Sequence, residues 1–141
     1  MIGTALTHAL LEKNYKVIIL SRQNEDGNAE RAGLSYARWD LSAQMIDANA
    51  IREADFIVHL AGAGIADKRW TKKRKKEIRG SRVKSSGLIV KSLSELPNNV
   101  KAVVSASAIG WYGADAVIPN PNPFREDDPS DAGFLGETSR E

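Results

Sequence analysis

The fold is decided by the stretch Val103-Val104-Ser105-Ala106-Ser107-Ala108-Ile109-Gly110-Trp111-Tyr112-Gly113. An apolar run over residues 102–104 ends there in small hydroxyl residues, followed by a glycine-aromatic turn. Ligands of open α/β sheets bind at the carboxyl ends of the strands. Ser105 and Ser107 are therefore placed to hydrogen-bond a bound molecule. An ordinary polar transition from strand to loop explains the same residues equally well.

The rest of the chain alternates between helical and extended patterns. Apolar residues at helical spacing predict helices over residues 2–13, 42–54, 71–96 and 134–141. Short β-branched or aromatic runs predict strands over residues 16–20, 34–39, 55–60 and 100–104. Residues 120–130 are expected to form a loop, and residues 23–33 a loop or a short helix. This alternation predicts an α/β protein with a Rossmann-like, doubly wound parallel sheet in a single domain, residues 1–141.

Composition excludes several classes of protein. The chain has 141 residues, and no apolar run approaches the ~20 residues needed to span a bilayer. The absence of cysteine excludes disulfides and thiolate chemistry, and it fits a reducing compartment, so we expect a cytoplasmic protein. Two histidines without a carboxylate at ligand spacing give no support for a metal site. The net charge of +2 names no partner, and we expect neither nucleic acid nor a membrane to be one.

The first residues resemble the end of a nucleotide-binding turn. A doubly wound nucleotide domain opens with a strand, a glycine-rich turn and a helix whose amino end holds the pyrophosphate. This chain opens on the helix, with Gly3 as the third glycine, whose role is close packing of helix on strand. The first strand is therefore expected to be lacking, and the strands that begin at Lys16 and Asp55 are expected to flank a gap.

Ser21 and Arg22 indicate which dinucleotide such a domain binds. The residue at the end of the second strand, about 20 positions beyond the glycine turn, meets the adenosine ribose. A carboxylate there favours NAD, whereas a guanidinium pairs with the 2′-phosphate of NADP. The sequence therefore favours NADP over NAD, although an exposed arginine after a strand is also ordinary.

Two further strand ends are candidates for cofactor contacts. Asp40 and Leu41 are placed to edge the adenine, with a helix cap before Ser42 or a simple turn as the alternative. The run Leu60-Ala61-Gly62-Ala63 has small residues that allow the backbone to approach the cofactor ribose. His59, just before this run, is expected to be a strand residue with a hydrogen-bonded ring.

Four blocks of the sequence carry a family resemblance. They are His59-Leu60-Ala61-Gly62-Ala63-Gly64-Ile65-Ala66-Asp67-Lys68-Arg69-Trp70, Lys76-Glu77-Ile78-Arg79-Gly80-Ser81-Arg82, the stretch over residues 105–113, and Phe134-Leu135-Gly136-Glu137. With these blocks the chain resembles the extended short-chain dehydrogenase/reductases, close to the NAD-dependent epimerase/dehydratase proteins. Within them it is similar to an atypical subgroup labelled "epimerase family protein".

The resemblance implies a Rossmann fold, a nicotinamide cofactor and a small, sugar-like substrate. It implies a nucleotide-sugar-type epimerase/dehydratase or an oxidoreductase. Members of the family begin with a strand and a glycine-rich turn and continue into a C-terminal substrate domain. The resemblance therefore implies that both of these parts are missing here.

The catalytic residues of the superfamily are matched only in part. The superfamily uses a serine, together with a tyrosine and a lysine four residues apart on one helix. Ser107 matches the serine, and Ser105 lies beside it as a cofactor contact. The tyrosine and lysine positions hold Phe134 and Thr138, which cannot transfer protons in that way. A catalytically inactive NADP-binding sensor or regulatory protein, or a non-functional fragment, therefore remains as an alternative.

A dense cationic run begins before the long helix. It consists of Lys68, Arg69, Lys72, Lys73, Arg74, Lys75, Lys76 and Arg79. Contact with phosphate and a solvated helix face both explain such a run.

Overall fold

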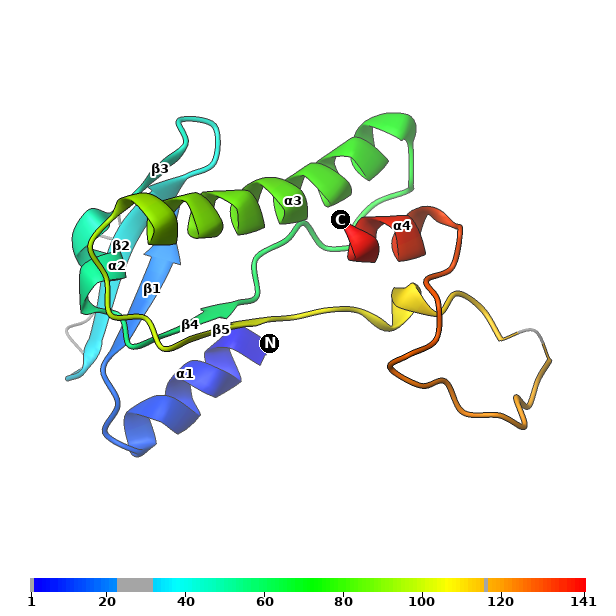
Figure 1. The fold of residues 1–141 in the computed structure, drawn as a ribbon, viewed down its shortest axis with the longest axis horizontal. Coiled ribbons are helices and arrows are strands. Elements are labelled where there is room, and N and C mark those ends of the chain that lie inside the picture. Colours follow the sequence, from blue (N-terminus) through cyan, green and yellow to red (C-terminus); the bar gives the residue numbers. More distant parts are fainter. Residues whose placement is uncertain (1, 23–31, 116) are drawn as a thin grey trace. The chain divides into compact units, whose positions relative to one another are not determined.

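The computed structural model describes residues 2–22, 32–115 and 117–141 (Figure 1). The chain packs as two compact units: Met1–Leu60 with Lys84–Val104, and Ala61–Val83 with Ser105–Glu141. We call them unit 1 and unit 2. Helix α3 (Lys72–Glu95) contributes residues to both. Most of the predicted loop over residues 23–33 lies outside the described residues.

Unit 1 begins with helix α1 (Ile2–Glu12). The helix cannot continue past Asn14, because the backbone there turns left-handed, with φ of 62°. The Tyr15 amide then donates to the Leu10 carbonyl at 3.0 Å, which satisfies an acceptor left open by the helix end.

The next two strands confirm the prediction of a parallel sheet. Strand β1 (Val17–Ser21) pairs in parallel with strand β2 (Leu34–Asp40), in a register that places Val17 opposite Leu34 and Ser21 opposite Arg38. Both strands therefore end at the same edge of the sheet, with Asp40 two residues beyond the partner of Ser21.

The helix predicted over residues 42–54 is wrong in its first part. Residues 41–44 form a turn, and strand β3 (Met45–Ile46) pairs antiparallel with the end of β2. Helix α2 (Ala48–Glu53) begins only after Asp47, whose carboxylate accepts hydrogen bonds from the Asn49 and Ala50 amides. A side-chain cap of this kind fixes a helix start more strongly than the apolar spacing before it.

Strands β4 (Phe56–His59) and β5 (Ala102–Ser105) form a second sheet. Among the described residues, β1, β2 and β3 form one sheet and β4 and β5 the other, with no pairing between β1 and β4. That these two strands flank a gap stays a prediction.

Helix α3 buries a continuous stripe of mixed chemistry. The buried positions recur at three- and four-residue spacing, as expected for one helix face, and they are Arg74, Ile78, Ser85, Leu88, Ile89 and Ser92. Trp39, Ala50 and Ile51 complete the buried apolar set of the described residues. In that part of the chain, no helix is both long enough and apolar enough to cross a membrane.

Unit 2 ends in a short 3₁₀ helix, η1 (Ile109–Trp111), and helix α4 (Phe134–Arg140). The predicted glycine-aromatic turn is this 3₁₀ helix. The Trp111 indole donates to the Asp128 carbonyl at 2.9 Å, and the Trp111 carbonyl accepts from the Asp131 amide at 2.7 Å. These bonds tie the carboxyl end of the predicted loop over residues 120–130, and the residue that follows it, to η1.

Candidate cofactor site

The carboxyl edge of the first sheet brings Ser21, Arg22 and Asp40 to one side of unit 1. Ser21 is half-buried as the last residue of β1, and Arg22 follows it as an exposed side chain. Within the part of the chain that the structure describes, Arg22 makes no salt bridge. Its side chain is exposed, as pairing with an anion from solution requires.

The Asp40 carboxylate accepts hydrogen bonds within the turn that follows it. One carboxylate oxygen accepts from the Ser42 amide at 2.8 Å and from the Ala43 amide at 3.1 Å. The Ala43 amide, followed by Ser42, holds the pKa of Asp40 below its usual value. The turn considered as an alternative for Asp40 is thus present, and the adenine contact of Asp40 and the half-buried Leu41 remains a prediction.

Gly3 and Leu60 lie together in unit 1. A β-carbon built on Gly3 would lie 3.9 Å from the Leu60 Cδ1, which is an ordinary contact distance. The described packing therefore does not by itself require glycine at position 3. Leu60 follows β4 and is 40% exposed.

The loop after Leu60 is fastened to α3 within unit 2. The Ser81 hydroxyl accepts from the Ala63 amide at 2.9 Å, and the Arg82 Nη1 donates to the Ala63 carbonyl at 3.1 Å. Gly62 lies against the same guanidinium: a β-carbon built on it would be 3.0 Å from the Arg82 Cζ. The predicted ribose-contacting run Ala61, Gly62 and Ala63 is thus held by two neighbouring side chains of one helix.

Arg74 holds the next part of that loop. Its side chain is 7% exposed and donates to the Gly64 carbonyl at 2.5 Å. It also pairs with the Asp67 and Glu77 carboxylates at 3.2 and 2.8 Å. The hydrogen bond from Arg74 lowers the pKa of Glu77. Arg74 is therefore a structural residue of the cationic run.

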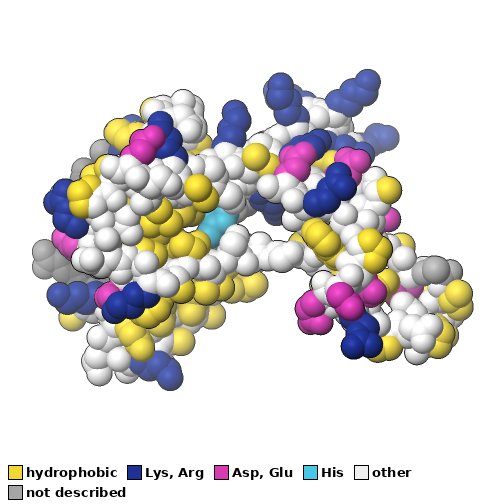
Figure 2. All heavy atoms as spheres, viewed as in Figure 1, with side chains coloured by type: hydrophobic (Ala, Val, Ile, Leu, Met, Phe, Trp, Pro, Cys, Tyr) yellow, Lys and Arg dark blue, Asp and Glu magenta, His cyan; other side chains and the backbone are white. Residues whose placement is uncertain are grey.

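The rest of that run divides into paired and solvated residues. Figure 2 shows the Lys and Arg side chains gathered over the amino-terminal half of α3. Arg79 pairs with Glu141, and the Lys75 ammonium lies 5.1 Å from the Phe134 ring centroid. The remaining side chains are exposed, as for a solvated face; they are Lys68, Arg69, Lys72, Lys73 and Lys76.

The predicted catalytic serine is exposed in unit 2. Ser105 ends β5, and Ser107 lies between that strand and η1. Both residues are exposed, as contact with a substrate or cofactor requires. Their roles remain predictions.

The positions expected for the tyrosine and lysine are occupied by packed residues. The Phe134 ring meets the Trp70 ring edge-on, with centroids 5.5 Å apart. Thr138 is 7% exposed, and its hydroxyl donates to the Phe134 carbonyl at 2.6 Å. Neither side chain can take the place of the tyrosine or the lysine in proton transfer.

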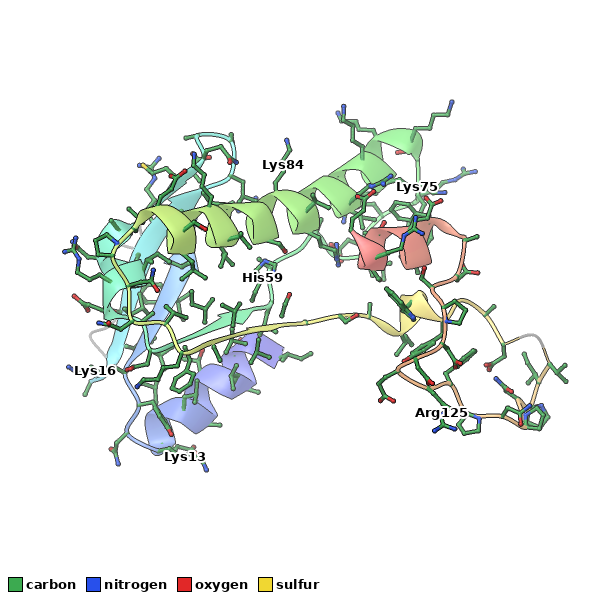
Figure 3. All side chains as sticks on the ribbon, in the orientation of Figure 1. Lys13, Lys16, His59, Lys75, Lys84 and Arg125 are labelled. Atoms are coloured by element: carbon green, nitrogen blue, oxygen red, sulfur yellow. The ribbon has the colours of Figure 1, made fainter. Side chains whose placement is uncertain are left out.

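His59 lies at the end of β4, directly before the loop (Figure 3). Its ring Nε2 is 2.8 Å from the Ser85 hydroxyl of α3, and the side chain is buried. The expectation of a hydrogen-bonded strand histidine is confirmed. Burial lowers the pKa of His59 below 6.5, because the charged ring loses hydration.

This lowered pKa predicts a pH-dependent stability. The folded chain binds fewer protons than the unfolded chain, so the contribution of His59 is complete above the unfolded pKa and is lost as the pH falls below it. We expect a lower melting temperature at about pH 5.5 than at about pH 7.5, and a smaller difference in His59→Gln. His8→Gln, on an exposed residue of α1, is the matched control. Equal pH dependence of the two variants would contradict the assignment.

The sequence did not predict the roles of two residues, Ser81 and Arg82. Ser81 and Arg82 lie in the block over residues 76–82 that carries the family resemblance, but the sequence assigns them no role. One feature of the sequence could have indicated a role for Ser81 and Arg82. They are a polar pair on the helix between the buried residues Ile78 and Ser85. A polar residue on a buried face is expected to hydrogen-bond a neighbouring backbone.

Comparison with known proteins identifies the family. A model of the NAD dependent epimerase/dehydratase family matches residues 1–133. The chain belongs to this family. The resemblance read from the four sequence blocks is thereby confirmed.

Individual relatives of the family extend beyond this chain. Epimerase family protein ML0860 of Mycobacterium leprae is 30% identical over 139 residues, covering 97% of this chain and 41% of that protein. Human epimerase family protein SDR39U1 is 31% identical over 113 residues, covering 79% of this chain and 34% of that protein. The chain thus spans less than half the length of these relatives.

Similar solved structures confirm the fold class. Human epimerase family protein SDR39U1, isoform 2, crystallised with NADPH, has a TM-score of 0.74 at 26% identity, over 98% of this chain and 42% of that chain. A mutated uronate dehydrogenase has a TM-score of 0.69 at 16% identity, over 99% of this chain and 46% of that chain. The second likeness concerns the fold alone.

Proposed function

We propose that this chain is the NADP-binding part of a short-chain dehydrogenase/reductase-like protein. The observation that carries the proposal is the exposed Arg22, directly after β1. A guanidinium there is suited to pair with a 2′-phosphate. The human relative crystallised with NADPH supports the same cofactor.

Two predicted contact residues of unit 2 suit the roles expected of them. Gly62 is exposed, and its loop is held by side chains of α3, so its backbone is available for close approach by a ribose. The exposed Ser107 is suited to hydrogen-bond a substrate oxygen. When bound, the cofactor would supply hydride transfer, and these residues would hold and orient the reactants.

The substrate class and the compartment belong to the same proposal. We propose a small, sugar-like substrate, with epimerisation, dehydration or oxidation as the reaction; the matching family is one of NAD dependent epimerases and dehydratases. We propose the cytoplasm as the compartment, because a chain without cysteine is compatible with a reducing environment. We propose no nucleic-acid partner, since Trp70, the aromatic residue within the cationic run, packs edge-on against Phe134.

A sensor without turnover is the second candidate. The packed Phe134 and the buried Thr138, at the positions of the family's proton-transferring pair, favour it. Turnover of a panel of nucleotide sugars and small carbonyl compounds with NADP⁺ or NADPH would favour an enzyme. Tight NADPH binding with no turnover of any of them would favour the sensor.

Arg22→Ala tests the cofactor assignment. We expect the Kd for NADPH to rise about tenfold, which corresponds to about 1.4 kcal/mol for one exposed charge-assisted contact. The Kd for NADH should stay unchanged, because NADH has no 2′-phosphate. Fluorescence titration of both nucleotides measures this. Arg52→Ala, on the exposed face of α2, is the control. Equal loss of NADPH and NADH binding would contradict a role at the 2′-phosphate.

A further inference from the structure

We propose that Arg82 is a positioning residue for the cofactor, acting with Ser81 as a latch that holds the loop over residues 61–64 on α3. This inference rests on the proposed function. It adds that Arg82 affects the binding of one half of the cofactor, the half that carries the nicotinamide. Arg82 is not expected to touch the dinucleotide. It acts through the backbone of Gly62 and Ala63, on the side of the site predicted to receive the ribose and nicotinamide.

The latch uses both polar groups of one loop residue. The Ala63 amide donates to the Ser81 hydroxyl at 2.9 Å, and the Ala63 carbonyl accepts from the Arg82 Nη1 at 3.1 Å. In a sheet, these two groups would be satisfied by a neighbouring strand. Here the loop belongs to no helix or strand, and two adjacent side chains of α3 take the place of that strand.

The helix itself fixes the latch in position. The Arg82 Nη1 also donates to the Ile78 carbonyl at 3.0 Å, and the Ser81 hydroxyl donates to the same carbonyl at 2.9 Å. Both side chains are therefore oriented by one turn of α3 before they reach the loop. A side chain held at two points loses less freedom when it binds the loop, so it defines the loop's conformation more sharply.

This arrangement explains why position 62 is glycine. Gly62 is not in the left-handed region, so its backbone alone does not demand glycine. A β-carbon built there would lie 3.0 Å from the Arg82 Cζ and 3.2 Å from both terminal nitrogens. To admit that β-carbon, the guanidinium, which is hydrogen-bonded to the Ala63 and Ile78 carbonyls, must shift by a few tenths of an ångström. Gly62 and Arg82 are therefore energetically coupled.

A double-mutant cycle tests the latch without any cofactor. We expect Gly62→Ala to lower the melting temperature by about 4 °C, the shift that about 1 kcal/mol produces in a small domain. In the background of Arg82→Ala, where the space is open, the same change should cost less than half of that. An equal cost of Gly62→Ala in both backgrounds would overturn the latch.

Binding of two probes tests the link to function. We expect Arg82→Ala to raise the Kd for NADPH about tenfold, while the Kd for 2′,5′-ADP, which lacks the nicotinamide half, stays unchanged. Ser81→Ala should act in the same direction with a smaller effect, and it provides a second variant if Arg82→Ala does not fold. A merely structural role would weaken both probes alike, and that result would overturn the proposal.

The two proposals fail in different ways. If the unaltered chain binds neither NADPH nor 2′,5′-ADP, the proposed function is wrong and the positioning role fails with it. If the unaltered chain binds NADPH and Arg82→Ala binds it equally well, the proposed function stands and the positioning role alone is wrong.

Discussion

Replacing Gly136 by alanine is expected to destabilise unit 2 by about 3 kcal/mol, the cost of forcing an atom into a fully packed site. Gly136 is buried in α4, and a β-carbon there would overlap the Asp131 carbonyl oxygen and lie 2.8 Å from the Asp131 carbonyl carbon. These are backbone atoms and cannot rotate away. Asp131 is itself fixed, since its amide donates to the Trp111 carbonyl and its carboxylate accepts from the Gly133 amide.

The sign of this effect distinguishes packing from helix propensity. Alanine ordinarily stabilises a helix over glycine by about 1 kcal/mol. Gly80→Ala, in α3 with no atom within 4 Å of its β-carbon position, is the matched control and should show that gain. Urea unfolding measures both variants. A stabilising Gly136→Ala would show that α4 does not pack on the Asp131 backbone.

Leu88→Ala should have a comparable effect on unit 1. Leu88 is 2% exposed on the buried stripe of α3, and truncation of such a leucine costs about 3 kcal/mol through lost burial and the cavity left behind. Leu88 also borders a groove of about 410 Å³ lined by Met45 and Ile46 of β3. Because the groove is open, neighbouring side chains can move into part of the space that the leucine leaves. We therefore expect the loss of unfolding free energy to lie within the usual range for a buried leucine.

The same helix supplies the control for Leu88. Val90→Ala, two residues on and 64% exposed, should change the unfolding free energy by less than about 0.5 kcal/mol. Chemical denaturation followed by far-UV circular dichroism reports both variants, with α3 contributing much of the signal. Similar costs for Leu88→Ala and Val90→Ala would contradict the orientation of α3 in unit 1.

Local patterns predicted most of the helices and strands. The β-branched run before Ser21 and the apolar spacing after Thr71 gave β1 and α3 within a few residues. The error at Met45 and Ile46 arose because apolar spacing cannot distinguish a short strand followed by a capped helix from one longer helix. The cap at Asp47 and the left-handed Gln44, with φ of 52°, decide between them.

The candidate site was predicted only as separate strand ends. Small residues after β4 indicated a loop with close backbone approach, but the partners of that loop lie 18 and 19 residues away on α3. No local pattern reports such contacts. The buried face of α3 is also hard to recognise in the sequence. Its positions include Arg74, Ser85 and Ser92, where a hydrophobic pattern expects apolar residues.

The central claim is that this chain binds NADP in preference to NAD, and calorimetric titration of the purified chain with NADPH and with NADH tests it most directly. We expect a Kd in the micromolar range for NADPH, at about 8 kcal/mol of binding free energy, and at least about tenfold weaker binding of NADH. A folded chain that binds NADH as tightly as NADPH, or binds neither, would contradict it.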